Sequence, residues 1–146
     1  MKTSDYTATI VVDQTPEEAF AAINNVRGWW TGEPGIEGST GKLNDEFTYD
    51  YKPYHHSKQK IIELIPGKKI VWLVIDSIIS FVEDKNEWTG TKITFDITKN
   101  GDKTEVRFTH VGLVPGVACY NDCSNAWGAY ITGSLRNLIA KGKKAA

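Results

Sequence analysis

The sequence predicts an α+β fold in which a curved antiparallel sheet of about six or seven strands surrounds one long C-terminal helix. Segments with strand periodicity follow one another through the middle of the chain and are joined by turn sequences, a pattern typical of antiparallel sheets. The C-terminal segment instead repeats apolar side chains every three or four positions, which is helical spacing. Because a sheet with one apolar face must be covered, we expect this helix to pack across it.

The N-terminal part predicts one strand followed by two short helices. Residues 6–12 are rich in β-branched side chains and favour a strand. Thr15 and Pro16 suit the N-cap and first position of a helix, and glutamates in the next two positions favour the positive end of its dipole. A second short helix is expected to start with residues 27–30, and Gly32 and Pro34 end it.

The central part predicts a run of strands. Residues 33–45 are rich in glycine and are expected to form a loop with at most one short edge strand. Residues 47–51 alternate apolar and polar side chains, which is the period of a half-buried strand. Residues 58–65 and 69–75 form a predicted hairpin around a Pro-Gly-Lys turn. Residues 77–86 fit either an extension of the second strand or a loop.

Two further strands, residues 92–97 and 104–111, flank an Asn-Gly-Asp sequence, which strongly favours a hairpin turn. Alternate residues of a strand share one face of the sheet, so the apolar series in each strand is expected to point inward. The polar residues between them are expected to face solvent. The side chains predicted to face inward in this hairpin are Ile93, Phe95, Ile97, Val106, Phe108 and His110.

The last helix carries an amphipathic stripe that should face the sheet. Trp127 lies in its middle and is predicted to be largely buried. Two glycines inside the helix, Gly128 and Gly133, suggest close packing against the sheet, and Gly142 suits the C-terminal end. The stripe consists of Cys123, Trp127, Tyr130, Ile131, Leu135, Leu138 and Ile139.

Several local strings occur along the chain in a characteristic order. They are Val-Val-Asp at 11–13, Pro-Glu-Glu-Ala-Phe at 16–20, Trp29-Trp30, residues 62–68, Val71-Trp72, Trp-Thr-Gly-Thr at 88–91, and Trp127, Tyr130, Ser134-Leu135, Leu138-Ile139 and Gly142. In this order they resemble the START-like (SRPBCC) superfamily, and within it the group named after the activator of the 90-kDa heat-shock protein ATPase. The resemblance implies a helix-grip fold over a single domain, residues 1–146. It also implies a cavity between the sheet and the last helix that binds lipids, steroids, polyketides or similar apolar molecules.

The aromatic residues then become candidate ligand contacts, because aromatic side chains with polar tips commonly line small-molecule sites. We expect an apolar ligand that is lipid-, polyketide- or aromatic-like, in the cavity between sheet and C-terminal helix. The physiological ligand is not identified by the sequence. The predicted ligand-binding residues are Trp30, Tyr49, Tyr51, Trp72, Phe95, Phe108, His110, Trp127 and Tyr130.

Two alternatives remain open. One is a cyclase- or hydrolase-type enzyme with His110 as a base and Tyr49 or Tyr130 as a polarising hydroxyl. The other is an interaction module that binds a chaperone, another protein or a second copy of the chain through an exposed apolar patch. No nucleophile elbow or phosphate loop occurs, so no catalytic residue is assigned.

Composition argues against several other classes. The net charge is −1 without a long run of like charge, so no nucleic-acid partner is expected. The longest apolar run, residues 70–75, is far too short for a membrane span, and the first residues lack the apolar run of a signal peptide, so a cytoplasmic location is expected. We expect no metal and no cofactor: Cys119 and Cys123 are interpreted as packing thiols, and His55-His56 as part of a solvated turn.

Overall fold

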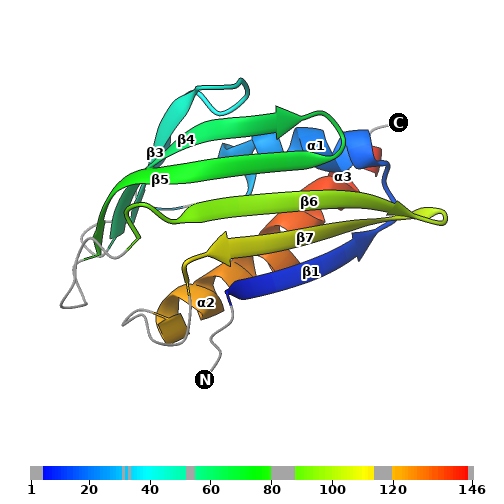
Figure 1. Ribbon diagram of the computed structural model, residues 1–146. Coiled ribbons are helices and arrows are strands. Elements are labelled where there is room, and N and C mark those ends of the chain that lie inside the picture. Colours follow the sequence, from blue (N-terminus) through cyan, green and yellow to red (C-terminus); the bar gives the residue numbers. More distant parts are fainter. Residues whose placement is uncertain are drawn as a thin grey trace.

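The computed structural model describes residues 5–30, 32, 34–51, 55–79, 88–113 and 120–144, and these form one strongly curved antiparallel sheet with helices on its concave side (Figure 1). The strands lie in the order β1-β7-β6-β5-β4-β3-β2. Their bounds are β1 Tyr6–Val12, β2 Pro34–Gly38, β3 Glu46–Tyr51, β4 His55–Ile65, β5 Lys69–Ile79, β6 Lys92–Asn100 and β7 Lys103–Val111. The chain therefore has the predicted helix-grip architecture.

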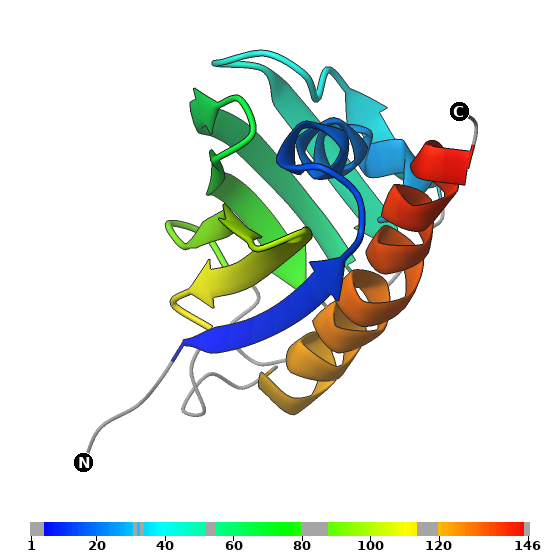
Figure 2. The same ribbon diagram turned by 90° about the vertical axis from the view of Figure 1, so that its right-hand side faces the viewer.

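The C-terminal helix lies across the inner face of the sheet (Figure 2). It consists of α2 (Tyr120–Ala129), a π-helical segment η2 (Tyr130–Leu135) and α3 (Arg136–Lys144). A short helix α1 (Pro16–Asn24) and a 3-10 turn η1 (Val26–Gly28) follow β1, and α1 packs against α3 at one end of the sheet. Within the part of the chain that the structure describes, none of the helices combines the length and apolar character that crossing a membrane requires.

Local sequence explains where α1 begins. The Thr15 hydroxyl accepts a hydrogen bond from the Glu18 backbone N–H, and the Glu18 carboxylate accepts one from the Thr15 N–H. This reciprocal capping box, with Pro16 at the first helical position, fixes the helix start as predicted. The second predicted helix is shorter than expected and lies earlier, since η1 ends at Gly28.

Both predicted hairpins are present, but their strands are longer than expected. Gly101 and Gly67 sit in the turns with φ of 66° and 72°, a backbone conformation that glycine adopts without steric cost. β4 begins at His55 rather than at residue 58, and β5 continues to Ile79. Residues 77–79 therefore extend the strand, whereas residues 80–87 lie outside the described residues.

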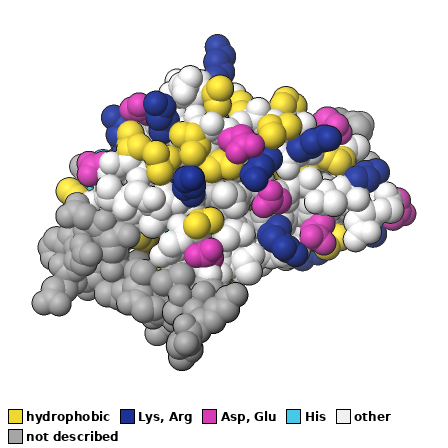
Figure 3. Space-filling model, in the orientation of Figure 1, with side chains coloured by type: hydrophobic (Ala, Val, Ile, Leu, Met, Phe, Trp, Pro, Cys, Tyr) yellow, Lys and Arg dark blue, Asp and Glu magenta, His cyan; other side chains and the backbone are white. Residues whose placement is uncertain are grey.

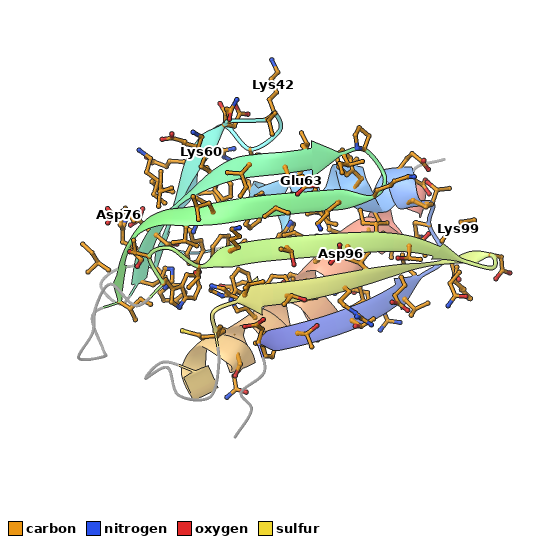
Figure 4. The ribbon with its side chains drawn as sticks, in the orientation of Figure 1. Lys42, Lys60, Glu63, Asp76, Asp96 and Lys99 are labelled. Carbon is orange, nitrogen blue, oxygen red and sulfur yellow. The ribbon has the colours of Figure 1, made fainter. Side chains whose placement is uncertain are left out.

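The two faces of the sheet differ sharply in chemistry. All six side chains predicted to face inward in the β6–β7 hairpin are buried. The outer face carries charged side chains, among them Lys60, Asp76 and Asp96, on the side of the sheet opposite the C-terminal helix (Figure 4). The inner face therefore forms the core together with the helices.

The C-terminal helix differs from the prediction in two details. It is interrupted by the π-helical segment η2, and it continues to Lys144, beyond the end expected near Gly142. A Cβ atom added at Gly128 would lie 3.2 Å from the Tyr6 hydroxyl of β1, so this glycine does permit a close approach to the sheet. Nothing lies within 4 Å of a Cβ placed at Gly133, so close packing does not explain that residue.

Candidate functional site

All five tryptophans lie in one buried aromatic cluster between the sheet and the C-terminal helix, and none is more than 4% exposed. Trp72 of β5 lies in its centre, with its ring 4.9 Å from that of Phe47 and 5.0 Å from that of Phe95. Trp30 stacks at 6.0 Å from Trp72 and lies 4.8 Å from Trp127, so it joins the sheet to the helix. Much of the predicted lining thus packs ring against ring.

Tyr49 connects the same cluster to the π-helical segment. Its ring stacks on Trp30 with centroids 4.1 Å apart, and its hydroxyl lies 3.1 Å from the Tyr130 hydroxyl, within hydrogen-bonding distance. Burial, and then the bond to Tyr130, raise the pKa of Tyr49 well above the usual value of 10.0. The Tyr49 phenol is therefore neutral at physiological pH.

His110 faces inward, as predicted, and both of its ring nitrogens are occupied. The Trp127 indole N–H can only donate, so it donates to His110 Nδ1 at 3.1 Å. In the neutral ring the proton then lies on Nε2, which donates to the Thr91 hydroxyl at 2.8 Å. Thr91 in turn donates to the Trp88 carbonyl at 2.6 Å. This chain fixes the tautomer and holds the helix against β7.

Burial lowers the pKa of His110 to about 3, and the nearby His55 lowers it further in the same direction. The imidazole is thus neutral at physiological pH. In this arrangement neither nitrogen is available to accept a substrate proton, because Nδ1 already accepts from Trp127 and Nε2 carries the ring hydrogen. The geometry therefore gives His110 a structural role and does not favour its role as a base.

A row of polar side chains points inward from β4, next to His110. The Gln59 side-chain N–H donates to the Ser57 hydroxyl at 2.5 Å, and that hydroxyl lies 3.0 Å from His55 Nε2. His55 packs edge-on against Trp88 with centroids 4.5 Å apart. Burial, and then the neighbouring His56, lower the pKa of His55 to about 4.

The predicted solvated turn at His55-His56 is therefore wrong. The two histidines begin β4 and point to opposite faces, with His55 inside and His56 2.7 Å from the Asp50 carboxylate outside. The alternation of residues 55–61 was visible in the sequence. Because both alternating sets contain polar residues, periodicity alone did not show which face is buried.

Two fully buried polar atoms of the inner face have no hydrogen-bond partner among the described residues. They are Trp72 Nε1, whose N–H is a donor, and Gln59 Oε1, which is an acceptor. Native proteins pair most buried polar atoms, because an unpaired one costs about 1–3 kcal/mol. Two complementary unpaired atoms on neighbouring strands are thus a feature that packing alone does not explain.

The structure brings together most of the residues predicted to bind ligand. Tyr51 differs, because it ends β3 and exposes 47% of its surface, although its parity matches Tyr49. The residues that the sequence did not assign to the site are Trp88, His55, Ser57 and Gln59. Trp88 precedes the predicted strand 92–97, so strand periodicity did not show whether its side chain faces inward.

The cysteines and metal-ligating residues form no metal site in the part of the chain described. Cys123 is buried and disulfide-bonded, so its interpretation as a packing thiol is wrong. Cys119 lies outside the described residues. Over the ranges given above, no three His, Cys, Asp or Glu side chains gather closely enough to hold a metal ion.

Comparisons with known proteins match this architecture over nearly the whole chain. The family model described as "Activator of Hsp90 ATPase homolog 1-like protein" matches residues 13–140. The solution structure of the Aha1 dimer from Colwellia psychrerythraea has a TM-score of 0.74 at 23% identity, covering 96% of this chain and 98% of that one. No curated protein matches the chain significantly.

Two further solved structures share the fold at lower identity. Protein Mll3558 from Rhizobium loti has a TM-score of 0.71 at 17% identity, covering 94% of this chain and 97% of that one. Protein BH1534 from Bacillus halodurans has a TM-score of 0.69 at 13% identity, covering 95% and 99%. At these identities the likeness concerns the fold alone.

Proposed function

Because the chain belongs to the family of Activator of Hsp90 ATPase homolog 1-like proteins, we propose that it binds an apolar small molecule between the inner face of its sheet and its C-terminal helix. The ligand is lipid-, polyketide- or aromatic-like. The binding surface consists of Trp30, Trp72 and Trp127 together with the polar side chains beside them. The fold serves this function because the helix covers the sheet and can exclude water from a bound molecule.

One observation carries the proposal: the inner face is polar where a purely structural core would be apolar. Ser57, Gln59, Ser77 and His110 are all completely buried on this face. Burying polar groups costs free energy unless they are paired, so a core selected only for stability rarely gathers four of them. Small-molecule sites, in contrast, combine an aromatic wall with a few polar groups that orient the ligand.

Direct binding of a neutral fluorescent probe tests the proposal. N-phenyl-1-naphthylamine is added to the protein, and probe emission, tryptophan quenching and melting temperature are followed together. We expect one probe per chain, quenched tryptophan emission and a raised melting temperature, because a ligand that binds only the folded state stabilises it. Unchanged tryptophan emission and melting temperature at saturating probe would contradict the proposal.

A matched pair of variants on β5 locates the bound probe. Val74 is buried on the inner face, whereas Ile78 of the same strand is 49% exposed on the outer face. Val74→Phe adds volume between sheet and helix and should weaken probe binding at least about tenfold, since the space is shared with the ligand. Ile78→Phe makes a comparable change outside and should bind normally. Equal effects of the two variants would argue against an internal site.

We also propose that the chain forms a homodimer through the outer face of its sheet. The similar Colwellia protein was solved as a dimer. Ile62, Ile65 and Ile78 are between 37% and 49% exposed on β4 and β5, and Figure 3 shows apolar side chains gathered over this face among charged ones. Sedimentation velocity should give a dimer that Ile78→Lys dissociates. A monomer at all concentrations would rule the proposal out.

A further inference from the structure

We infer that the site between sheet and C-terminal helix selects ligands with a neutral hydroxyl group, which is held between the Trp72 indole N–H and Gln59 Oε1. The inference rests on the proposed function and specifies its ligand chemistry. It starts from the two fully buried atoms that have no partner among the described residues.

The two side chains occupy adjacent positions on the inner face. Gln59 of β4 pairs with Val74 of β5, and Trp72 lies two residues from Val74 on the same side of that strand. Such diagonal neighbours lie within reach of large side chains. Phe47 confirms the proximity, because it pairs with Gln59 across β3–β4 and its ring lies 4.9 Å from that of Trp72.

The neighbouring hydrogen bonds determine which kind of hydrogen-bonding group can pair with both atoms. Gln59 uses its side-chain N–H to donate to Ser57, so its oxygen is the group that still requires a donor. The indole nitrogen of Trp72 can only donate, so it requires an acceptor. A group that satisfies both must accept one hydrogen bond and donate another. The hydroxyl of an alcohol or phenol does so with a single oxygen atom.

Ionised groups do not meet this requirement. A carboxylate has no hydrogen to donate to Gln59 Oε1, and an ammonium group has no lone pair to accept from Trp72. Nor does this part of the inner face offer a charge to balance theirs, because His55 and His110 are both held neutral by burial. An uncompensated charge placed here would lose its hydration. The site therefore distinguishes a neutral hydroxyl from a charged head group on the same apolar body.

Three probes with the same ring system test this selectivity: 2-naphthol, naphthalene and 2-naphthoate. Isothermal calorimetry measures their dissociation constants. We expect 2-naphthol to bind about tenfold more tightly than naphthalene, because it gains two net hydrogen bonds in a water-free site. We expect 2-naphthoate to bind more weakly than naphthalene. Equal affinity of 2-naphthol and naphthalene would overturn the inference, and it is the outcome expected if water alone occupies the two atoms.

Variants assign the effect to the two atoms. Trp72→Phe removes the indole N–H, and Gln59→Met removes Oε1 together with the N–H that donates to Ser57. Each leaves an apolar side chain and should bring the two affinities to within about threefold. Trp29→Phe is the matched control, because the Trp29 N–H already donates to the Ile23 carbonyl at 3.1 Å. It should retain the preference for 2-naphthol. Retention in Gln59→Met and Trp72→Phe as well would contradict the assignment.

An NMR measurement on the unaltered protein tests the inference without any substitution. The indole N–H resonance of Trp72, identified by through-bond assignment, should move downfield with 2-naphthol and much less with naphthalene. Absence of this difference would also overturn the inference. If none of the three probes binds, the proposed function fails and the inference fails with it. If all bind with similar affinity, the hydroxyl selectivity alone is wrong.

Discussion

The inner face of the sheet has two largely buried halves that are chemically different. The apolar half lies beside α1 and α3 and consists of Val12, Ile70, Ile97 and Val106. The polar half lies toward α2 and consists of His55, Ser57, Gln59, Ser77 and His110. In the apolar half burial stabilises the fold through removal of apolar surface from water. In the polar half each buried group requires a partner, and Gln59 Oε1 has none among the described residues, nor has the N–H of the neighbouring Trp72.

This difference indicates which half of the inner face to test for function. An apolar half of this kind would be expected in any member of the fold, because it holds the sheet and helices together. Buried polar groups stabilise a core less than apolar packing does, so the proposed ligand binding offers a reason for the chemistry of the polar half. Mutations in the apolar half should therefore mainly lower stability, whereas mutations in the polar half should mainly weaken ligand binding.

The largest effect is expected at Trp127, which lies in the polar half and also packs on the sheet. Its ring lies 4.6 Å from Phe108 and 4.8 Å from Trp30, and its N–H serves His110. Trp127→Ala should lower the free energy of unfolding by about 3–5 kcal/mol. Trp127→Phe keeps a ring but leaves His110 Nδ1 unpaired, and should cost about 1–3 kcal/mol. Urea unfolding measures both, and a wild-type value for Trp127→Ala would show that the helix does not hold the sheet by this face.

Acid should destabilise the polar half selectively. The pKa of His110 is about 3 in the folded state and near 6.5 when unfolded, so below pH 6.5 the unfolded chain binds protons that the folded one does not. Stability is therefore fully present above about pH 6.5 and is lost as the pH falls toward 3, by about 3 kcal/mol at pH 4. The lowered pKa of His55 adds to the loss down to about pH 4.

Unfolding curves between pH 4 and 8 test this dependence. His110→Gln cannot titrate in this range and should flatten the pH dependence of the unfolding free energy, whatever its own stability. An equally steep dependence in His110→Gln would mean that other groups cause the acid sensitivity.

A polar atom placed in the apolar half should be costly. Ile70→Thr removes apolar volume from a fully buried position and introduces a hydroxyl among apolar neighbours. We expect a loss of about 2–4 kcal/mol in urea unfolding, compared with about 0.5–1.5 kcal/mol for the control Ile70→Val. If the two variants are equally stable, the apolar half accepts a buried hydroxyl without cost, and the proposed difference between the two halves is wrong.

The reverse change in the polar half should be nearly neutral. Gln59→Met removes the unpaired oxygen but also the N–H that donates to Ser57, and it keeps a side chain of similar length. The two effects oppose each other, so we expect the stability of the ligand-free protein to change by no more than about 1 kcal/mol in either direction. The same variant should lose its selectivity for hydroxyl ligands. Its melting temperature without ligand provides the measurement, and a loss above about 2 kcal/mol would indicate that Gln59 is mainly structural.

The sequence was sufficient to predict the inward face of the β6–β7 hairpin and the order of the elements. Alternation in the β6–β7 hairpin, the Asn-Gly turn and the Thr15 cap each depend on a few neighbouring residues, so local chemistry determines them. The order of elements then led to the helix-grip fold, which the family and structural comparisons confirm.

The polar half could not be predicted in the same way, because its arrangement depends on contacts between distant segments. His110 could be placed on the inner face by parity, but its partners Thr91 and Trp127 come from other elements. The inward direction of His55 and Gln59 was hidden by polar residues on both faces of β4. The exposure of Tyr51 likewise reflects the position where β3 ends, which alternation within the strand does not encode.

The π-helical segment η2 has a consequence for the phase of the C-terminal helix. The buried residues of its stripe recur at intervals of four: Cys123, Trp127, Ile131, Leu135 and Ile139. In an α-helix each such interval overshoots a full turn by about 40°, so the stripe would wind away from the sheet. A π-helix rotates less per residue, which corrects this drift and keeps both ends of the stripe on the sheet. Deleting one residue within η2 should therefore give an uninterrupted α-helix that still holds Ile139 against the sheet, because the π-helical segment absorbs the rotation of about one residue.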